Sequence, residues 1–556
     1  MINGADHTSM LTGTFSCGAL SQDPFMVLRG KCQFFSEDPR TPGTKNISYD
    51  FDMVGTDGEM FHFNGYNVID DSIAFAPWRT WRATSTLYVT LTHLKNNSVV
   101  GRGVMRITNL GSEIASFSAT GSTLSARVEA TRRFLAYYTK QIARFFFAPL
   151  ASLVWPGISV MTYPHKDPPA ETTQVIASDG VKTTLRMWTP VNSAHKNQHL
   201  SDMPILFIPG VAVDHNIFAI STIKLNSIEF FTRSGATCFC VTHRIGKTDL
   251  AEAGWTTYDA RLDIAAALNQ ITSRYPPGTK VYVVAHCAGS IALSIGLLDG
   301  TIPAQSIKGI TASNVFMNPK FPWVNRLKAG VSVPLSALYG SLVGPWFSCI
   351  SSPDDRVVQK LMDQVLRFYP VGSRKELCNS VVCHRSELVF GRYVFEHALY
   401  IITGADCNIR VCRLWSHRNL NSATHSALSD FLGGVSLRCL THLILMGVSG
   451  TVTSYALLSS TDSSESPKKV ADATNLDRLK HIPIFFFSGG ENNVYTPEAT
   501  DTSYTILRDK FDEGQYERDV FEEFGHLDCW MGERASDVIW PRIREHMVKV
   551  CGGLIN

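Results

Sequence analysis

The stretch that decides the fold is Val281-Tyr282-Val283-Val284-Ala285-His286-Cys287-Ala288-Gly289-Ser290. An apolar β-type run ends in the pattern small-x-Cys-x-Gly, and a helical pattern begins directly after it. This order is typical of a nucleophile elbow, a sharp turn that exposes a reactive side chain between a strand and a helix. The turn needs small residues two positions before and after the nucleophile, and Ala285 and Gly289 occupy these positions. Elbows usually carry Ser and open with Gly, so this chain departs from the pattern at Cys287 and Ala285.

On both sides of the elbow, strand and helix patterns alternate from about residue 172 onward. Such alternation predicts a mostly parallel sheet with helices on both faces. A helix is expected at 257–274, between the second and third strands of this sheet. The expected strands are 204–208, 236–242, 280–285, 307–313, 482–487 and 516–521.

The remaining segments predict two additions to this core. Residues before about 120 alternate polar and apolar side chains around turn signals such as Thr56-Asp57-Gly58, which favours antiparallel strands. Helical periodicity follows at 122–147, and we expect that helix to pack one domain on the other. We therefore predict an α/β-hydrolase fold with an N-terminal antiparallel β-rich domain and a large helical cap insertion. The expected bounds are 11–160 for the β-rich domain, 172–319 and 476–556 for the core, and 320–475 for the cap.

The charge balance and the cysteines restrict the partners and the compartment. The chain has 556 residues, with 51 Lys and Arg against 49 Asp and Glu, so no basic excess is left to hold nucleic acid. No stable membrane insertion is expected, because the apolar segment 329–353 is interrupted by Pro and Gly. The polar start of the chain and 13 scattered cysteines favour a cytoplasmic protein with reduced thiols.

Cys287 is the expected nucleophile. At a helix N-terminus, the dipole and the free N–H groups would stabilise its thiolate. The N–H of Ala288 would donate to an oxyanion, and the N–H of Val211, in the loop after the strand 204–208, is the expected second donor. The alternative is a buried structural cysteine on a degenerate elbow.

The general base is expected from His526, because the base follows the last strand in this fold. His546 lies on a later helical stretch and is expected to be solvated. The third member should follow the strand 482–487, where Glu491 is preferred as a carboxylate and Asn492 is the uncharged alternative. No metal or cofactor is expected.

A thiol nucleophile indicates the class of substrate. Transfer of an acyl group from an oxyester to a thiol is uphill, whereas transfer between two thioesters is nearly isoenergetic. Cys287 therefore points to a thioester donor, such as an acyl-carrier protein or coenzyme A. Water would release an acid from the acyl-enzyme, and a hydroxyl of the same chain would release a lactone.

Three motifs together resemble a known family: Ala285 to Ser290, Gly525-His526-Leu527-Asp528-Cys529-Trp530-Met531-Gly532, and Gly13-Thr14-Phe15-Ser16-Cys17-Gly18-Ala19-Leu20. They are similar to the hydrolase portion of cholesterol-oxidase-like flavoproteins and, more closely, to fungal polyketide thiohydrolases of the brefeldin and decarestrictine type. The resemblance implies a chain-release enzyme that works in trans on the acyl-carrier protein of a highly reducing polyketide synthase. It implies release by hydrolysis or macrolactone formation, with Cys287 and His526 in the catalytic positions. It implies no flavin, since no Gly-x-Gly-x-x-Gly follows a strand.

Two other functions remain open: an esterase or lipase on free oxyesters, and a non-catalytic acyl-carrier docking protein. In the cap, His384, His397 and His425 are expected to be structural, with substrate or carrier contact as the alternative. The aromatic candidates for the acyl pocket, with plain core packing as their alternative, are Trp323, Trp346, Phe347 and Phe368.

Overall fold

A computed structural model describes residues 8–38, 44–70, 73, 77–106, 120, 122–147, 168–190, 200–201, 203–321, 344–350, 357–366, 380–390, 414–455, 467–511 and 514–552. These residues form two compact units, which are described separately. The described residues up to 147 belong to the first unit, and those from 168 onward belong to the second.

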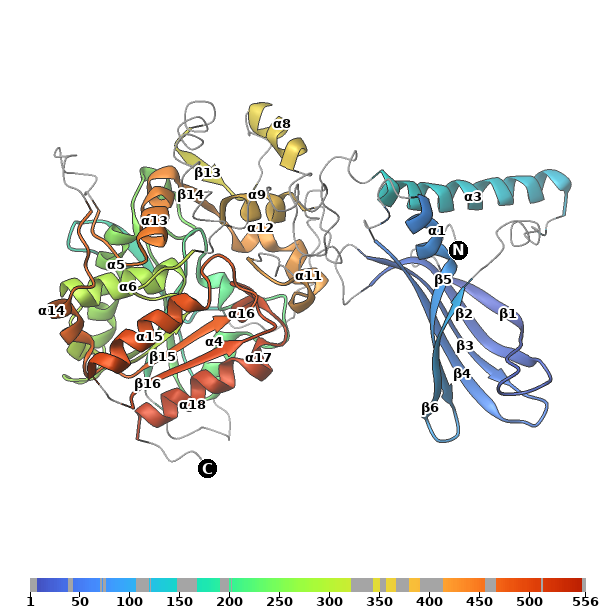
Figure 1. Cartoon of the computed structure of the whole chain (residues 1–556), viewed down its shortest axis with the longest axis horizontal. Helices are drawn as coiled ribbons and strands as arrows, with labels where there is room; N and C mark the ends of the chain where they lie inside the picture. The colour runs from blue at the N-terminus through green and yellow to red at the C-terminus, as the bar shows by residue number, and fades with distance from the viewer. Residues whose placement is uncertain are drawn as a thin grey trace. The chain divides into compact units, whose positions relative to one another are not determined.

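The first unit is a six-stranded antiparallel sheet in which the strands pair in chain order (Figure 1). Alternating side chains point to one face and form an aromatic core around Phe25, Phe51 and Phe63. The elements are β1 (Thr8–Phe15), β2 (Phe25–Glu37), β3 (Lys45–Val54), β4 (Met60–Ile69), α1 (Pro77–Ser85), β5 (Thr86–His93), β6 (Ser98–Arg106) and α3 (Leu124–Phe146). The predicted antiparallel β structure of this region is confirmed.

Helix α3 packs on the sheet of its own unit. Tyr137 and Tyr138 contact the ring of Phe35 in an edge-to-face manner, and Phe145 lies in the same buried cluster. We expected this helix to pack one domain on the other. In the described contacts, it packs on the β-rich unit itself.

The second unit is built on an eight-stranded sheet in the order β16-β15-β12-β11-β9-β10-β8-β7. The strands from β10 to β16 are parallel, and β8 joins β10 antiparallel, as β7 joins β8. This is the sheet of the α/β-hydrolase fold, which confirms the predicted fold class. The strands are β7 (Glu171–Ile176), β8 (Lys182–Trp188), β9 (Pro204–Ile208), β10 (Thr237–Thr242), β11 (Val281–His286), β12 (Ile307–Ser313), β15 (Ile484–Gly489) and β16 (Tyr516–Phe521).

Helices lie on both sides of this sheet (Figure 1). Helices α5 and α6 pack against each other, and α18 packs against α4. The helices of the core are α4 (Ser227–Arg233), α5 (Thr257–Thr272), α6 (Ala288–Asp299), α14 (Ala473–Leu476), α15 (Glu498–Phe511), α16 (Asp528–Met531), α17 (Ala535–Val538) and α18 (Trp540–Val550). Short 3₁₀ turns are η3 (His215–Ile217), η4 (Asp249–Ala253), η5 (Ala304–Ser306) and η7 (Asp477–Leu479).

The described residues between β12 and α14 form mainly short helices, and we call this region the cap segment. Its described elements are β13 (Trp346–Ser348), α8 (Val357–Leu366), α9 (Val381–Phe390), η6 (His417–Asn419), α11 (Ser422–Ser426), α12 (Leu428–Phe431), β14 (Gly434–Ser436) and α13 (Leu437–Ser449). Most of the apolar stretch 329–353 lies outside the described residues. None of the helices in the described part of the chain is long and apolar enough to cross a bilayer.

Candidate active site

Cys287 occupies the turn between β11 and α6. Its backbone has φ 54° and ψ −129°, a conformation that non-glycine residues adopt rarely and that is found where a functional site imposes it. The turn is closely packed, because a Cβ at Gly210 would lie 2.9 Å from the Cβ of Cys287. The side chain of Cys287 is buried, at 8% exposure. The structure therefore places this residue in the geometry expected of an elbow.

Both expected N–H donors point at the sulfur of Cys287. The backbone N–H groups of Ala288 and Val211 donate hydrogen bonds to it. His243 fixes the loop that carries Val211, because its Nε2 donates to the carbonyl oxygen of Pro209 at 2.8 Å. One donor from the loop after β9 and one from the start of α6 therefore meet next to the sulfur.

His526 lies beside the sulfur. The sulfur of Cys287 and one nitrogen each of His526 and His286 lie within 4.8 Å of one another. His526 is 1% exposed, and its Nδ1 contacts Oδ1 of Asn492 at 3.2 Å. Its Nε2 has no protein partner among the described residues. Side chains from three strand ends thus meet at the carboxyl edge of the sheet.

The hydrogen bonds of Asn492 determine which nitrogen of His526 carries the proton. Oδ1 of Asn492 accepts from the N–H of Val494 at 3.1 Å, and its Nδ2 donates to Oδ1 of Asn314 at 3.1 Å. Because this orientation presents an acceptor to the imidazole, Nδ1 of His526 is the protonated nitrogen. Nε2 therefore keeps its lone pair, which is the tautomer that a general base needs.

The preferred candidate for the third position, Glu491, is not the partner of His526. Its carboxylate instead forms an ion pair with Arg418, with Oε1 and Nη2 2.5 Å apart. The tight turn after β15 directs consecutive side chains in different directions, so the amide of Asn492 points inward and is fully buried. Asn492, the alternative candidate, therefore occupies the third position of the site in place of Glu491.

Asn314 joins the loops of the site, and sequence reasoning missed it. It follows β12 with φ 71°, and its Oδ1 accepts from the N–H of Gly489 at 3.1 Å as well as from Asn492. Its Nδ2 donates to the carbonyl oxygen of His526 at 2.9 Å. Asparagine tolerates a positive φ better than most residues, which is the only sequence signal that could have indicated this position.

His286, next to the nucleophile, is fully buried and was also missed. The hydroxyl of Ser313 accepts from Nε1 of Trp530 and Nδ2 of Asn314, both at 3.3 Å. Its single proton is therefore available for Nδ1 of His286, at 3.1 Å. This places the ring proton of His286 on Nε2, which has no protein partner among the described residues.

Burial dominates the electrostatics of the site. It raises the pKa of the Cys287 thiol to about 12, and the two N–H donors offset only part of this rise. It also lowers the pKa of His526 to about 3 and that of His286 well below its usual value. The prediction of a resting thiolate at Cys287 is therefore wrong. The thiol and the imidazole of His526 are both neutral, because desolvation outweighs the helix dipole.

A neutral thiol predicts a specific pH dependence of alkylation. The rate of modification of Cys287 by iodoacetamide is expected to rise continuously from neutral pH to about pH 10, because the thiolate fraction grows tenfold for each pH unit below the pKa. The measurement is peptide mass spectrometry of the modified Cys287 at each pH. A rate that levels off at neutral pH would show a preformed thiolate and imidazolium pair instead.

A small apolar cavity adjoins the sulfur. Its volume is about 20 Å³, room for about one water molecule. It is lined by Gly210, Val211, Val213, His286, Cys287, Phe390, Leu414, Leu432, Val494, His526 and Leu527. The cavity is therefore too small to hold an acyl chain, and Phe390 of the cap segment is one of the side chains that line it.

The other candidates lie elsewhere or outside the described residues. Trp346 and Phe347 lie on β13 and are not among the residues that line this cavity. Trp323, Phe368 and His397 lie outside the described residues, and His384 is buried on α9. His546, expected to be solvated, is 3% exposed and contacts the hydroxyl of Tyr282 at 2.6 Å.

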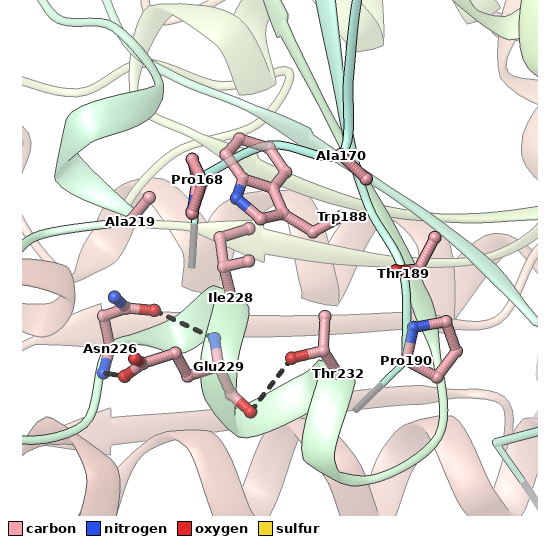
Figure 2. Close-up of a pocket in the computed structure, with 10 residues that line it drawn as sticks. All are labelled: Pro168, Ala170, Trp188, Thr189, Pro190, Ala219, Asn226, Ile228, Glu229 and Thr232. Carbon is pink, nitrogen blue, oxygen red and sulfur yellow. Dashed lines mark hydrogen bonds between the residues drawn. The ribbon is translucent and has the colours of Figure 1, made fainter. Parts of the chain in front are cut away.

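A larger cavity of about 200 Å³ lies between β8 and α4 (Figure 2). Its polar side chains serve the helix start: Oδ1 of Asn226 accepts from the N–H of Glu229 at 2.9 Å, and Oε2 of Glu229 accepts from the N–H of Asn226 at 3.1 Å. This is a capping box. None of the predicted site residues lines this cavity.

A substitution at Gly289 can test how closely the elbow is packed. A Cβ at this position would collide with the carbonyl oxygen of Pro209, which cannot move without displacing the loop of Val211. Gly289→Ala is expected to lower the free energy of unfolding by about 3 kcal/mol. Urea denaturation measures the effect, and Gly101→Ala, where a Cβ meets open space, is the control. Equal stability of the two variants would contradict the close approach.

The chain is similar to several solved structures at low identity. A monoglyceride lipase from Saccharomyces cerevisiae is 10% identical over 70% of this chain and 99% of its own, with a TM-score of 0.39. DcsB in complex with a substrate analogue is 11% identical over 69% and 99%, with a TM-score of 0.37. An epoxide hydrolase from Vigna radiata is 17% identical over 68% and 98%, with a TM-score of 0.34.

The sequence matches no protein-family model and no curated protein. At these low identities and scores, the fold assignment rests on the strand order of the sheet and not on any one of the matches.

Proposed function

We propose that the chain is a cysteine-dependent acyltransferase of the α/β-hydrolase type that takes an acyl group from a carrier-protein thioester. The acyl group is then released as a lactone or an acid. One observation carries the proposal: the sulfur of Cys287 lies within 4.8 Å of the imidazole of His526 and receives the N–H groups of Val211 and Ala288. A nucleophile, a base and two oxyanion donors are the parts that acyl transfer requires.

The first step forms one thioester and breaks another. Cys287 sulfur attacks the carbonyl carbon of the substrate while Nε2 of His526 takes the thiol proton. The N–H groups of Val211 and Ala288 stabilise the negative oxygen of the tetrahedral intermediate. The carrier thiol then leaves with the proton from His526, and the acyl group remains on Cys287.

The second step regenerates the thiol. A hydroxyl of the bound chain, or a water molecule, attacks the acyl carbon while His526 takes its proton. Cys287 leaves and recovers this proton, and the product is a lactone or an acid. The apolar side chains Phe390, Leu414 and Leu432 near the sulfur exclude water, which favours attack by the chain's own hydroxyl.

The thiol nucleophile supports a thioester substrate over an oxyester, because transfer of an acyl group from an oxyester to a thiol is uphill. Thioester exchange is nearly isoenergetic, and it needs no stored thiolate because His526 accepts the proton during the attack. The carrier protein of a polyketide synthase, acting in trans, is the proposed donor. An oxyester substrate is the competing function, since the same fold and apolar cavity also suit it.

Product analysis with a synthetic substrate tests the proposal. The protein is incubated with an ω-hydroxyacyl thioester and, separately, with the matching nitrophenyl oxyester. We expect an acyl adduct on Cys287 by intact-mass analysis, and lactone or acid from the thioester. Faster turnover of the oxyester, kept in Cys287→Ser, would support the esterase instead. Binding of carrier protein without either product would support a docking protein.

A further inference from the structure

A second group of one thiol and two imidazoles lies in the cap segment. Cys383 is on α9, His417 is on η6, and His425 is on α11. Cys383 and His417 are buried, and His425 is partly buried. We propose that these three side chains bind a zinc ion. The inference goes beyond the proposed function, which uses none of them.

The spacing of the donor atoms fits a tetrahedral ion. The sulfur of Cys383 lies 3.7 Å from Nε2 of His417 and 3.3 Å from Nε2 of His425. Two ligands at ordinary Zn–S and Zn–N bond lengths and a tetrahedral angle lie about 3.5 Å apart. All three atoms lie within 4.8 Å of one another, so a small shift of the rings places the ion at bonding distance from each.

The chemistry of the group favours a metal over hydrogen bonds alone. A thiol has one proton and its sulfur is only a weak acceptor, so at least one of the two imidazole nitrogens that approach it is held by no more than a weak N–H···S contact. Zinc instead uses the lone pairs of both imidazoles and of the thiolate, and its binding releases the thiol proton to solvent. Thiolate sulfur and imidazole nitrogen are both ordinary ligands of zinc.

The ion would join segments that form the wall of the catalytic cavity. Helix α9 carries Cys383 and also Phe390, which lines the cavity beside Cys287. Leu414 lines the same cavity and lies three residues before His417, and its N–H donates to Oε1 of Glu387 on α9 at 2.9 Å. Zinc would therefore fix α9 against the segment that begins at Leu414.

The test must separate this group from the one around Cys287, which also combines a thiol with two imidazoles. The full chain is produced with a histidine-free tag in the Cys287→Ala background, in zinc-supplemented medium, and its metal content is measured after gel filtration. We expect equimolar zinc in this background and near none after the further change Cys383→Ala. The matched control is Cys349→Ala, which removes another buried thiol of the cap segment and should keep the zinc.

Three results would overturn the proposal: no equimolar zinc in the Cys287→Ala background, zinc retained in Cys383→Ala, or copper in place of zinc. If Cys383→Ala does not fold, the metal-free Cys287→Ala chain is titrated with Co²⁺. A thiolate-to-cobalt charge-transfer band is then expected, and its absence also overturns the proposal. Because Cys287 is missing throughout, failure here leaves the proposed acyl transfer untouched.

Discussion

Turnover of an acyl thioester is expected to fall by at least about 10³-fold when Cys287 is replaced by Ala. The reason is that no other described thiol lies at the point where the N–H groups of Val211 and Ala288 meet beside His526. The residual rate would come from binding and from the oxyanion donors alone. Steady-state release of the carrier thiol measures the rate, and intact-mass analysis measures the acyl adduct.

Cys439→Ala provides the matched control for this prediction. Cys439 is also a buried free thiol, on α13, and is 1% exposed. Cys439 does not line the catalytic cavity, so turnover should stay within about twofold of the wild type when this thiol is removed. Unchanged turnover in Cys287→Ala, with no adduct on the wild-type protein, would refute the role of this sulfur.

Asn492→Ala is expected to lower kcat for the thioester by about 10²-fold. Without its Oδ1, Nδ1 of His526 loses the acceptor that fixes the tautomer and the ring orientation. Glu491→Gln is the comparison, because its carboxylate forms an ion pair with Arg418 instead, and kcat should change by less than about twofold. A larger loss of kcat in Glu491→Gln than in Asn492→Ala would identify Glu491 as the third member of the catalytic site.

The substitution Asn492→Asp is expected to change the kcat–pH profile, which it would not do if residue 492 had only a structural role. A carboxylate next to His526 favours the imidazolium and so raises the pKa of this histidine. Since only the neutral imidazole accepts the thiol proton, the acid limb of the kcat–pH profile should move to higher pH. Glu491→Asp should leave the limb in place. An unmoved limb in Asn492→Asp would mean that residue 492 does not act through His526.

The elements of the hydrolase core could be predicted because each carries its own local pattern. The strands β9, β12 and β16 have the bounds predicted from the sequence, and the elbow was recognised from small residues around Cys287. Strands β7 and β8 were missed. Their alternating side chains match an edge of a sheet, and no motif marks them as part of the same sheet as β9.

The third member of the site could not be chosen from the sequence. Glu491 and Asn492 are neighbours, and chemistry alone favours the carboxylate. The turn after β15 sends one side chain to Arg418 and the other to His526, and that depends on the packing of Asn314 against three loops. Cys383 likewise lies 34 residues before His417, and the two meet with His425 only in the folded cap.

The sequence by itself determined the residue types and the positions of most strands of the core, because apolar periodicity and small residues act over a few positions. It also determined which sulfur sits at the elbow. The tertiary structure alone decided the protonation of that sulfur. Burial raises its pKa to about 12 and lowers that of His526 to about 3, and burial is a property of everything packed around a group.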